Sequence, residues 1–450
     1  MASLGSTRDA KAVAAELEAQ DVRAVRLLFP DLHGVARGKD VPVGSLGHVA
    51  EEGAAFCAAV LATDLRQTPV VEKTDAFSDF LARPDLGTLR VVPWQPDVAW
   101  CVADLWHADR DERWPGCPRG SLVAVTGRYA ELGLTPLVGP ELEFFLLERD
   151  AAVPGGYRRY VDDDSRSYTV GYVSDPRGVV VDMLAACERL GLQVRSANHE
   201  FSNSQYEITV GHSRPLDAAD RGFLLKAAVK ELAARAGLVA TFMGKPFNDQ
   251  GGTGFHVHLS VQGEDGENAF AGEEGPHGLS PLQGRFVAGV LAHAPALTAV
   301  LAPTVNAYKR MVPDSLVPTH ANWGHDNRTA FVRVPSERGP RARIEVRAGD
   351  GAANAHLIIA ALLAAGLDGI RRELEPPPPL EGNAYRAADA GEPLPRSLGA
   401  ALALLADDEI LVAALGESLV KTFVTMKRFE AARFDAWVTD WELDEYANHL

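Results

Sequence analysis

Segments that alternate apolar and polar residues recur along the chain, between longer segments whose apolar residues return once per helical turn. Alternation predicts a strand with one buried face, and the helical spacing predicts an amphipathic helix. The predicted strands are residues 22–29, 35–41, 89–93, 98–104, 137–147, the strand-rich segment 193–210, 239–243, 331–335 and 341–347. The predicted helices are residues 9–20, 122–132, 179–190, 221–236, 282–302 and 353–374, followed by a helical tail. This mixture indicates an α+β fold.

The loop at residues 107–118 divides the chain into two parts. It is rich in charge, proline and glycine, and it follows a predicted hairpin whose turn lies at residues 30–34. We therefore predict that a small N-terminal α+β domain ends in this loop and that a larger domain follows. A chain of 450 residues is long enough for roughly two or three domains.

The charge and cysteine content exclude several classes of protein. A net charge of −17 argues against nucleic acid or an anionic membrane as a partner. The four cysteines show no C-x-x-C spacing, which is typical of reduced thiols in a cytosolic protein. The start of the chain lacks the apolar core of a secretory signal, and the longest apolar run, at residues 357–366, is too short to cross a bilayer. We therefore expect a cytoplasmic protein with no membrane or nucleic-acid partner.

Residues 251–260 are the most informative stretch of the sequence. After a glycine-rich start, the alternation gives one face to apolar residues and the other to His256, His258 and Ser260. A pair of structural histidines is the simpler interpretation of this strand taken alone. Other predicted strands repeat the pattern, and the repetition favours a functional site.

The repeated feature is a strand whose polar face carries Glu, His or Arg. It occurs at Glu141 and Glu143, at Glu200 and Glu207, at His256 and His258, and at Arg343, Glu345 and Arg347. A solvated sheet face is the alternative, but large apolar residues flank these acids, which favours a cleft. Crowded carboxylates keep their protons unless cations neutralise them, and carboxylates with an imidazole and no thiolate suit Mg²⁺ or Mn²⁺. The pattern therefore predicts a site for divalent metal ions.

The second half of the chain adds arginines, several of them at predicted strand ends. These are Arg310, Arg328, Arg333, Arg343 and Arg347. A guanidinium group binds carboxylate or phosphate with two parallel hydrogen bonds, although a single exposed arginine is more often only a surface residue. Acids for metal ions and arginines for phosphates are the groups that phosphoryl transfer needs. The sequence contains neither a P-loop nor the protein-kinase signature set, so a nucleotide would be held in another way.

Together these motifs resemble the glutamine synthetase superfamily. They are Gly139-Pro-Glu141-Leu-Glu143, His199-Glu200, Gln205-Tyr-Glu207, Lys245-Pro246, Gly252-Thr-Gly254-Phe-His256-Val-His258, Asn306-x-Tyr308-Lys309-Arg310, Asn327-Arg328, Arg343-Ile-Glu345-Val-Arg347 and Ala353-Asn354. The motifs follow the family's order and span nearly the whole chain. The resemblance implies a small N-terminal β-grasp domain at residues 1–113 and a large catalytic domain at residues 114–450, in which an antiparallel sheet forms a half-barrel funnel. It also implies a homo-oligomer, a dodecamer of two hexameric rings with active sites between neighbouring subunits.

The resemblance implies a role for each matching residue. The ligands of the first metal ion would be Glu143, Glu200 and Glu207, and those of the second would be Glu141, His256 and Glu345, with roughly two to three Mg²⁺ or Mn²⁺ ions per site. The residues that bind glutamate would be Gly252, Arg310 and Arg347. The catalytic residues at the transferred phosphate would be Arg328 and Arg333, together with Glu207. The residues that line the ATP site would be His258, Ser260 and Arg343.

Two departures from the family's pattern bear on the amine. Glutamine synthetases carry an aspartate in the N-terminal domain and a glutamate in a flap after the Tyr-Lys-Arg motif, and Cys57 and Leu316 stand at the matching positions here. Ammonium needs a compact anionic pocket, whereas these residues make the pocket apolar and roomier. The stretch at residues 323–328 also resembles γ-glutamyl-polyamine and γ-glutamyl-monoamine synthetases. We therefore expect an ATP-dependent ligase that joins glutamate to an organic amine through γ-glutamyl phosphate and releases ADP and phosphate.

Three alternatives stay open at this point. One is a true glutamine synthetase with a rearranged ammonium site. Another is an inactive relative with a structural or regulatory role, although the sequence keeps every expected metal ligand. The third concerns the acid substrate: Ser204 and Gly251 stand where the family often has glycine and asparagine, so a glutamate analogue is also open.

Overall fold

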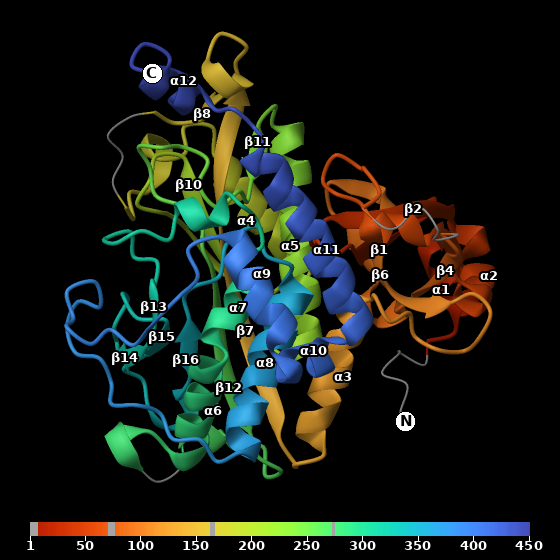
Figure 1. Cartoon of the computed structure of the whole chain (residues 1–450). Helices are drawn as coiled ribbons and strands as arrows, with labels where there is room; N and C mark the ends of the chain where they lie inside the picture. Colours follow the sequence, from red (N-terminus) through yellow and green to blue (C-terminus); the bar gives the residue numbers. More distant parts are fainter. Residues whose placement is uncertain (1–7, 71–76, 163–166, 272–274) are drawn as a thin grey trace.

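The computed structural model describes residues 8–70, 77–162, 167–271 and 275–450. In Figure 1 these residues form a small N-terminal unit beside a much larger body that carries a long curved sheet. The fold is the α+β arrangement that the sequence predicts. The boundary between the two domains at residues 113 and 114 stays a prediction.

The N-terminal unit is built on a mixed sheet with the strand order β2-β1-β6-β4-β3, and β5 pairs with β6. Its strands are β1 (Ala24–Pro30), β2 (Ala36–Pro42), β3 (Ala54–Cys57), β4 (Asp79–Pro84), β5 (Arg90–Val92) and β6 (Gln95–His107). The predicted hairpin is present, because β2 returns antiparallel to β1. Helices α1 (Ala10–Glu18) and α2 (Leu46–Glu52) cover one face with Val13, Leu17 and Leu46. Trp100, on the other face, joins the large core, so the two units share buried surface.

The large body contains a sheet with the order β14-β15-β16-β12-β7-β10-β9, in which β8 and β11 also pair with β7. Its strands are β7 (Thr135–Arg149), β8 (Tyr157–Arg159), β9 (Val194–His199), β10 (Gln205–Val210), β11 (Val239–Thr241), β12 (Phe255–Gln262), β14 (Trp323–His325), β15 (Val332–Val334) and β16 (Ile344–Val346). Two further strands, β13 (His320–Ala321) and β17 (Glu392–Pro393), pair with each other. The long strand β7 lies at the centre of the sheet, and the sheet curls around it into a half-barrel.

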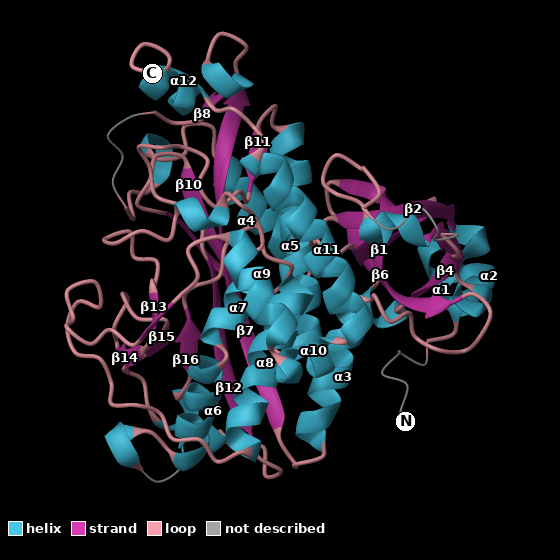
Figure 2. Ribbon diagram, in the orientation of Figure 1, coloured by secondary structure: helices cyan, strands magenta, loops and turns pink. Residues whose placement is uncertain are grey.

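Helices cover one face of this sheet (Figure 2). They are α3 (Pro118–Ala130), α4 (Val179–Arg189), α5 (Pro215–Arg235), α6 (Pro281–Ala292), α7 (Ala294–Leu301), α8 (Ala355–Arg371), α9 (Leu398–Asp407), α10 (Glu409–Leu415) and α11 (Glu417–Asp435). The last helix, α12 (Asp440–Tyr446), lies beside the C-terminus and has no buried residues. Helix α8 is buried over most of its length and contacts α3, α5, α6, α7 and α10. The uncovered face of the sheet is therefore left for a functional site.

The prediction of a single helix at residues 282–302 is wrong in one respect. The structure divides it at His293 into α6 and α7, which are bent by 74°. Pro295 lies in the first turn of α7, and a proline inside a continuous helix would lose a hydrogen bond and clash with the preceding turn. Among the described residues, no single helix is long and apolar enough to cross a membrane, and this bent pair passes that test only when its two helices are combined.

Candidate active site

Strand pairing brings the predicted metal ligands to one face of the large sheet. The pairs across neighbouring strands are His256 with Glu141, Glu207 with Glu143, and Glu345 with His258. Glu200 follows directly after β9. Directly paired residues point to the same side of a sheet, so strands that are distant in the sequence contribute to one cluster.

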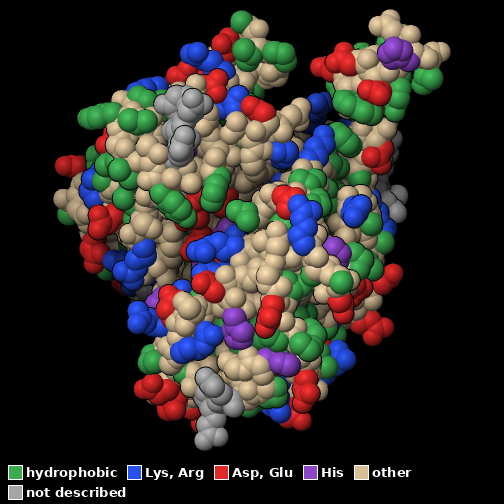
Figure 3. Space-filling model, turned by 90° about the vertical axis from the view of Figure 1, so that its left-hand side faces the viewer, with side chains coloured by type: hydrophobic (Ala, Val, Ile, Leu, Met, Phe, Trp, Pro, Cys, Tyr) green, Lys and Arg blue, Asp and Glu red, His purple; other side chains and the backbone are tan. Residues whose placement is uncertain are grey.

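These side chains line a cavity of about 510 Å³, which we call the carboxylate cavity. Its lining includes the six predicted metal ligands and also Gly252, Arg310, Leu316, Arg328, Arg333 and Arg347. Figure 3 shows red and blue side chains recessed between green ones near the centre of one face of the molecule. The structure therefore gathers the predicted metal, glutamate and phosphate residues around a single cavity.

A second cavity of about 490 Å³ adjoins the first, and we call it the Arg343 cavity. It is lined by the three residues predicted for the ATP site, His258, Ser260 and Arg343. Glu141 borders both cavities, and its Oε1 lies 2.9 Å from His258 Nε2. A ligand in the Arg343 cavity would therefore lie next to the metal ligands.

Hydrogen bonds fix the orientation of the carboxylates. The Nε2 of Gln205 and the backbone N–H of Gly254 both donate to Glu143 Oε2, each at 2.7 Å. The Nδ2 of Asn198 donates to Glu200 Oε1 at 2.7 Å. No role was predicted for Gln205 or Asn198, although Gln205 shares the alternating face of Glu207 and that alternation was a usable signal.

The arginines are held in the same way. Arg333 Nη1 donates to Glu345 Oε2 at 2.6 Å, and Arg347 donates to the other oxygen of Glu345. Arg310 is buried, and its two terminal nitrogens donate to the carbonyl oxygens of Ala348 at 3.2 Å and Gly349 at 2.9 Å. Guanidinium groups anchored to the frame are suited to bind anions without further ordering of the side chain.

The ionisation of the cluster shows that it fits cations. Burial together with Glu141, Glu143 and Glu200 raises the pKa of Glu207 to about 9. Burial and the charge of Glu143 raise the pKa of Glu200 to about 7. Burial tends to raise the pKa of Glu141, but the neighbouring imidazoles of His256 and His258 outweigh burial and lower this pKa. Some of these carboxylates therefore hold protons at neutral pH unless a positive charge replaces the protons.

The donor atoms are close enough to share one ion. Single ligand atoms of Glu141, Glu207 and His256 all lie within 4.8 Å of one another. Carboxylate oxygens with one imidazole nitrogen are the donor set that Mg²⁺ and Mn²⁺ accept. A divalent ion bound there would supply positive charge beside a transferring phosphoryl group.

The two residues predicted for the amine side have different positions. Leu316 lines the carboxylate cavity, is 37% exposed and has a positive φ of 59°. Asp314, two residues earlier, forms an ion pair with Arg386 at 2.7 Å and does not line the cavity. Cys57 is exposed on β3 of the N-terminal unit and borders neither cavity, so within one chain it does not join the site.

Two aromatic residues at the carboxylate cavity were not predicted. Tyr168 and Phe201 line it together with Leu316 and Val317, and both aromatic side chains are largely exposed. Tyr168 lies outside the predicted segments, and Phe201 lies between the two strands of the segment 193–210, so the hydrophobic pattern contained no signal for them. They add an apolar rim to a cavity whose interior is charged.

The chain is similar to known proteins over nearly its whole length. A model of the glutamine synthetase catalytic domain matches residues 115–446. The glutamine synthetase of Methanocaldococcus jannaschii is 40% identical over 382 residues, which cover 82% of this chain and 83% of that protein. The glutamine synthetase of Thermotoga maritima is 35% identical over 447 residues, with 96% and 97% covered. A solved structure described as "GmaS/ADP complex-Conformation 1" has a TM-score of 0.87 and 34% identity, covering 97% of this chain and 99% of that one. The chain therefore belongs to the glutamine synthetase family, whose members are ATP-dependent, ADP-forming carbon–nitrogen ligases.

Proposed function

We propose that this ligase joins the γ-carboxylate of glutamate, or of a close analogue, to an organic amine that has an apolar portion. The family acts on ATP and glutamate and uses divalent metal ions, so the amine is the open part of the reaction. The observation that carries the proposal is Leu316 at the carboxylate cavity. The acid closest to it in the sequence, Asp314, is already paired with Arg386.

The apolar rim supports the same choice of amine. Tyr168, Phe201, Leu316 and Val317 surround the cavity with carbon atoms. Such a rim offers an alkyl group contact area, whereas it offers an ammonium ion no negative charge to replace its water. Ammonium is therefore the weaker substrate in this proposal.

The other groups have roles that follow from their contacts. His258, Ser260 and Arg343 would hold the nucleotide in the Arg343 cavity that they line. Arg310 and Arg347 would bind the carboxylates of glutamate beside Gly252. Arg328 and Arg333 would stabilise the negative charge of the transferred phosphoryl group, after which the amine displaces phosphate from γ-glutamyl phosphate.

The assembly belongs to the same proposal. The family is oligomeric, and we expect a dodecamer of two hexameric rings in which the N-terminal unit of one subunit brings Cys57 to the site of its neighbour. The exposed position of Cys57 on β3 agrees with such a contact. Mass photometry should give about twelve times the chain mass of 48.2 kDa, and a monomer that is fully active would contradict the shared site.

The test is a comparison of amines by their rate of ADP release. With glutamate, ATP and Mg²⁺ present, an organic amine from a panel of short monoamines and polyamines should give a higher kcat/KM than ammonium. Turnover that ammonium alone supports at low millimolar concentration, with no organic amine doing better, would reject the proposal.

A variant links the choice of amine to the flap. Leu316→Glu returns a negative charge to the cavity, so kcat/KM for the organic amine should fall by about tenfold, which is about 1.4 kcal/mol, while ammonium use rises. Val312→Glu is the matched control, because Val312 is an exposed residue of the same segment that does not line the cavity. Equal behaviour of the two variants would show that Leu316 does not select the amine.

A further inference from the structure

A separate cavity of about 730 Å³ lies between the N-terminal unit and the large body, and we call it the interdomain cavity. Its walls come from the turn between β1 and β2, from α5 and α11, and from residues 241–243 and 303–306. None of its lining residues also lines the carboxylate cavity or the Arg343 cavity. It is therefore a space distinct from the proposed active site.

The interdomain cavity is lined by three lysines with different surroundings. Lys427 is buried and already neutralised, because its Nζ lies 3.0 Å from Glu430 Oε2. Lys226, on α5, is 9% exposed, and its Nζ donates to the carbonyl oxygen of Ala353 at 2.5 Å. Lys230, one helical turn later, is exposed at the opening of the interdomain cavity. Within the described part of the chain, no carboxylate lies within 4.0 Å of Lys226 or Lys230.

The ammonium of Lys226 is poorly compensated for a buried charge. Its Nζ lies 5.5 Å and 5.3 Å from the ring centres of Phe242 and Phe255, which offer only a weak electrostatic attraction. A buried charge without a counter-ion is unfavourable and tends to lose its proton. Burial and the charge of Lys230 accordingly lower the pKa of Lys226 to about 7, and the carboxylate of Asp350 opposes this only in part.

The walls around this ammonium are largely apolar. Phe223, Phe242, Met243 and Leu65 line the cavity, and the side chains of Met243 and Leu65 are partly exposed at its rim. A ligand that matches both features carries one negative group for the lysines and a hydrocarbon body for the walls. A hydrophobic anion would gain from burial of its carbon atoms and would restore the missing counter-ion.

We propose that the interdomain cavity is a binding site for a small hydrophobic carboxylate, with its carboxylate at Lys226 and Lys230 and its hydrocarbon body against Phe223 and Phe242. The site differs in its residues from the active site, so this proposal stands whether or not the amine of the reaction is correctly assigned. The remaining titratable groups on its walls are His33, Glu231, Lys427 and Glu430. Glu430 is paired with Lys427, and Glu231 lies 3.8 Å from Arg26, so both acids already have cationic partners.

The test is isothermal titration calorimetry of the full chain with octanoate at about pH 8, in two buffers of different ionisation enthalpy. Octanoate should bind with uptake of close to one proton, because Lys226 must be charged to pair with it. Octanol, which has the same hydrocarbon body without the charge, should bind at least tenfold more weakly and without proton uptake. Equal binding of octanoate and octanol, or no binding of octanoate, would overturn the proposal.

Variants locate the site. Lys226→Met should abolish proton uptake and weaken octanoate binding by at least tenfold. Because replacing a buried lysine also affects folding, Ala227→Leu provides a second variant that fills the cavity and keeps both lysines, and it should weaken binding to a similar degree. Ala234→Leu on the exposed side of the same helix is the matched control and should bind as the unchanged protein does. Unchanged binding in Ala227→Leu would place the octanoate elsewhere and reject the site.

Discussion

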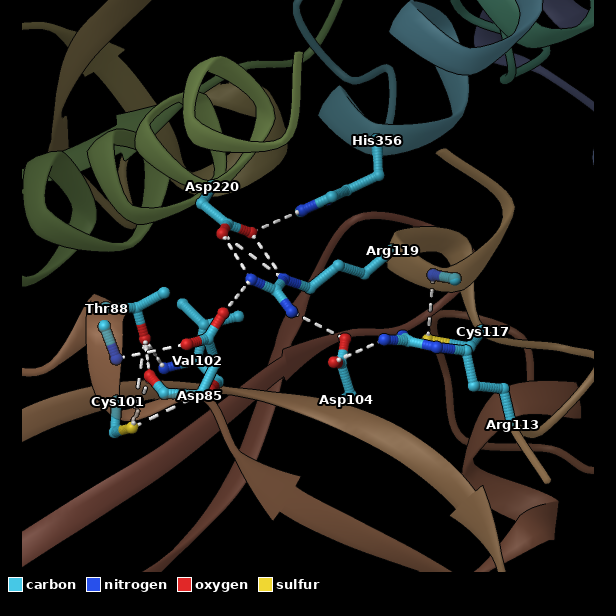
Figure 4. A network of polar contacts seen from close by, with 12 residues as sticks. Asp85, Thr88, Cys101, Val102, Asp104, Arg113, Cys117, Arg119, Asp220 and His356 are labelled. Carbon is cyan, nitrogen blue, oxygen red and sulfur yellow. Dashed lines mark hydrogen bonds and ion pairs between the residues drawn. The ribbon is translucent and has the colours of Figure 1, made fainter. Parts of the chain in front are cut away.

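Replacement of Arg119 by methionine tests the contact that joins the N-terminal unit to the large body. Figure 4 shows the Arg119 guanidinium between three aspartates, two from the N-terminal unit and one from α5. It donates to Asp85 at 2.7 Å, to Asp104 at 2.6 Å and to Asp220 at 3.0 Å, and it is 1% exposed. His356 on α8 contacts the same carboxylate of Asp220 at 2.8 Å.

The expected loss is large because Arg119→Met leaves acids behind. Removing one partner of a buried ion pair costs about 3–5 kcal/mol, since the remaining charge stays buried without compensation. Methionine keeps much of the hydrocarbon stem of Arg119, so little of the loss comes from packing. With an unfolding entropy of about 2 cal/mol/K per residue, a chain of this length would lose about 3–5 °C of Tm if it unfolds in one transition.

The pH dependence of the stability provides a second, independent test of the same variant. Burial would raise the pKa of Asp220, but the charges of Arg119 and His356 outweigh it and lower the pKa from 3.8 to about 2. Because its pKa is lowered, Asp220 contributes about 2 kcal/mol to the free energy of unfolding when the pH is above its ordinary pKa, and this contribution is lost as the pH falls toward 2. The difference in stability between the unchanged protein and Arg119→Met should therefore shrink as the pH is lowered below about 4.

The assay is thermal and urea unfolding followed by circular dichroism at neutral and acidic pH. Arg128→Met is the matched control, because Arg128 lies on the same helix, is solvent-accessible and donates to the carbonyl oxygen of Ala413 at 3.1 Å. The control should lose less than about 1 kcal/mol. The reasoning is refuted if both variants lose the same stability, or if the deficit of Arg119→Met is unchanged in acid.

Three further predictions concern other parts of the molecule. His293 lies 2.6 Å from Asp408, and although burial tends to lower the pKa of His293, its carboxylate partners raise it. The contribution of His293 to the stability should therefore be complete below about pH 6.5 and should be lost as the pH rises through the raised pKa. His293→Asn should flatten this pH dependence of Tm. Asp350 Oδ2 lies 3.9 Å from Arg310 Nη1, so Asp350→Asn should raise KM for glutamate by about tenfold with little change in kcat, and an unchanged KM would contradict the pairing. Glu143→Ala should abolish ADP release with any amine and weaken Mn²⁺ binding in calorimetry, and retained activity would reject the metal site.

The strands that build the site could be predicted because their alternation is regular. Residues 255–260 alternate without interruption, and residues 141–144 alternate within the longer predicted strand 137–147, so both the strands and the side chains on their polar faces follow from the sequence. The small strands β3 and β4 were not predicted. Their sequences, Ala-Ala-Phe-Cys and Asp-Phe-Leu-Ala-Arg-Pro, are short and do not alternate, and they exist as strands because β3 pairs with β4 and β4 pairs with β6.

The ion pairs of Arg119 and the cavity beside Lys226 could not be predicted from the sequence, because they depend on contacts between distant segments. Arg119, Asp85, Asp104 and Asp220 lie far apart in the chain, and no local pattern distinguishes them from ordinary surface charges. Their positions become informative only when α3, α5 and the N-terminal sheet are packed together. The same holds for Lys226, which periodicity alone places on a helix without indicating a cavity beside it.

The central strand β7 connects the stability of the fold to the chemistry of the site. Glu141 and Glu143 face the carboxylate cavity, while Leu142 and Phe144, which alternate with them, are buried in the core beneath the helices. A shift of β7 by one residue would exchange these two sets, burying the acids and exposing the apolar side chains. Burial of Leu142 and Phe144 therefore fixes where the acids lie, so a change in the volume of Leu142 should alter metal binding although Leu142 contacts no ligand.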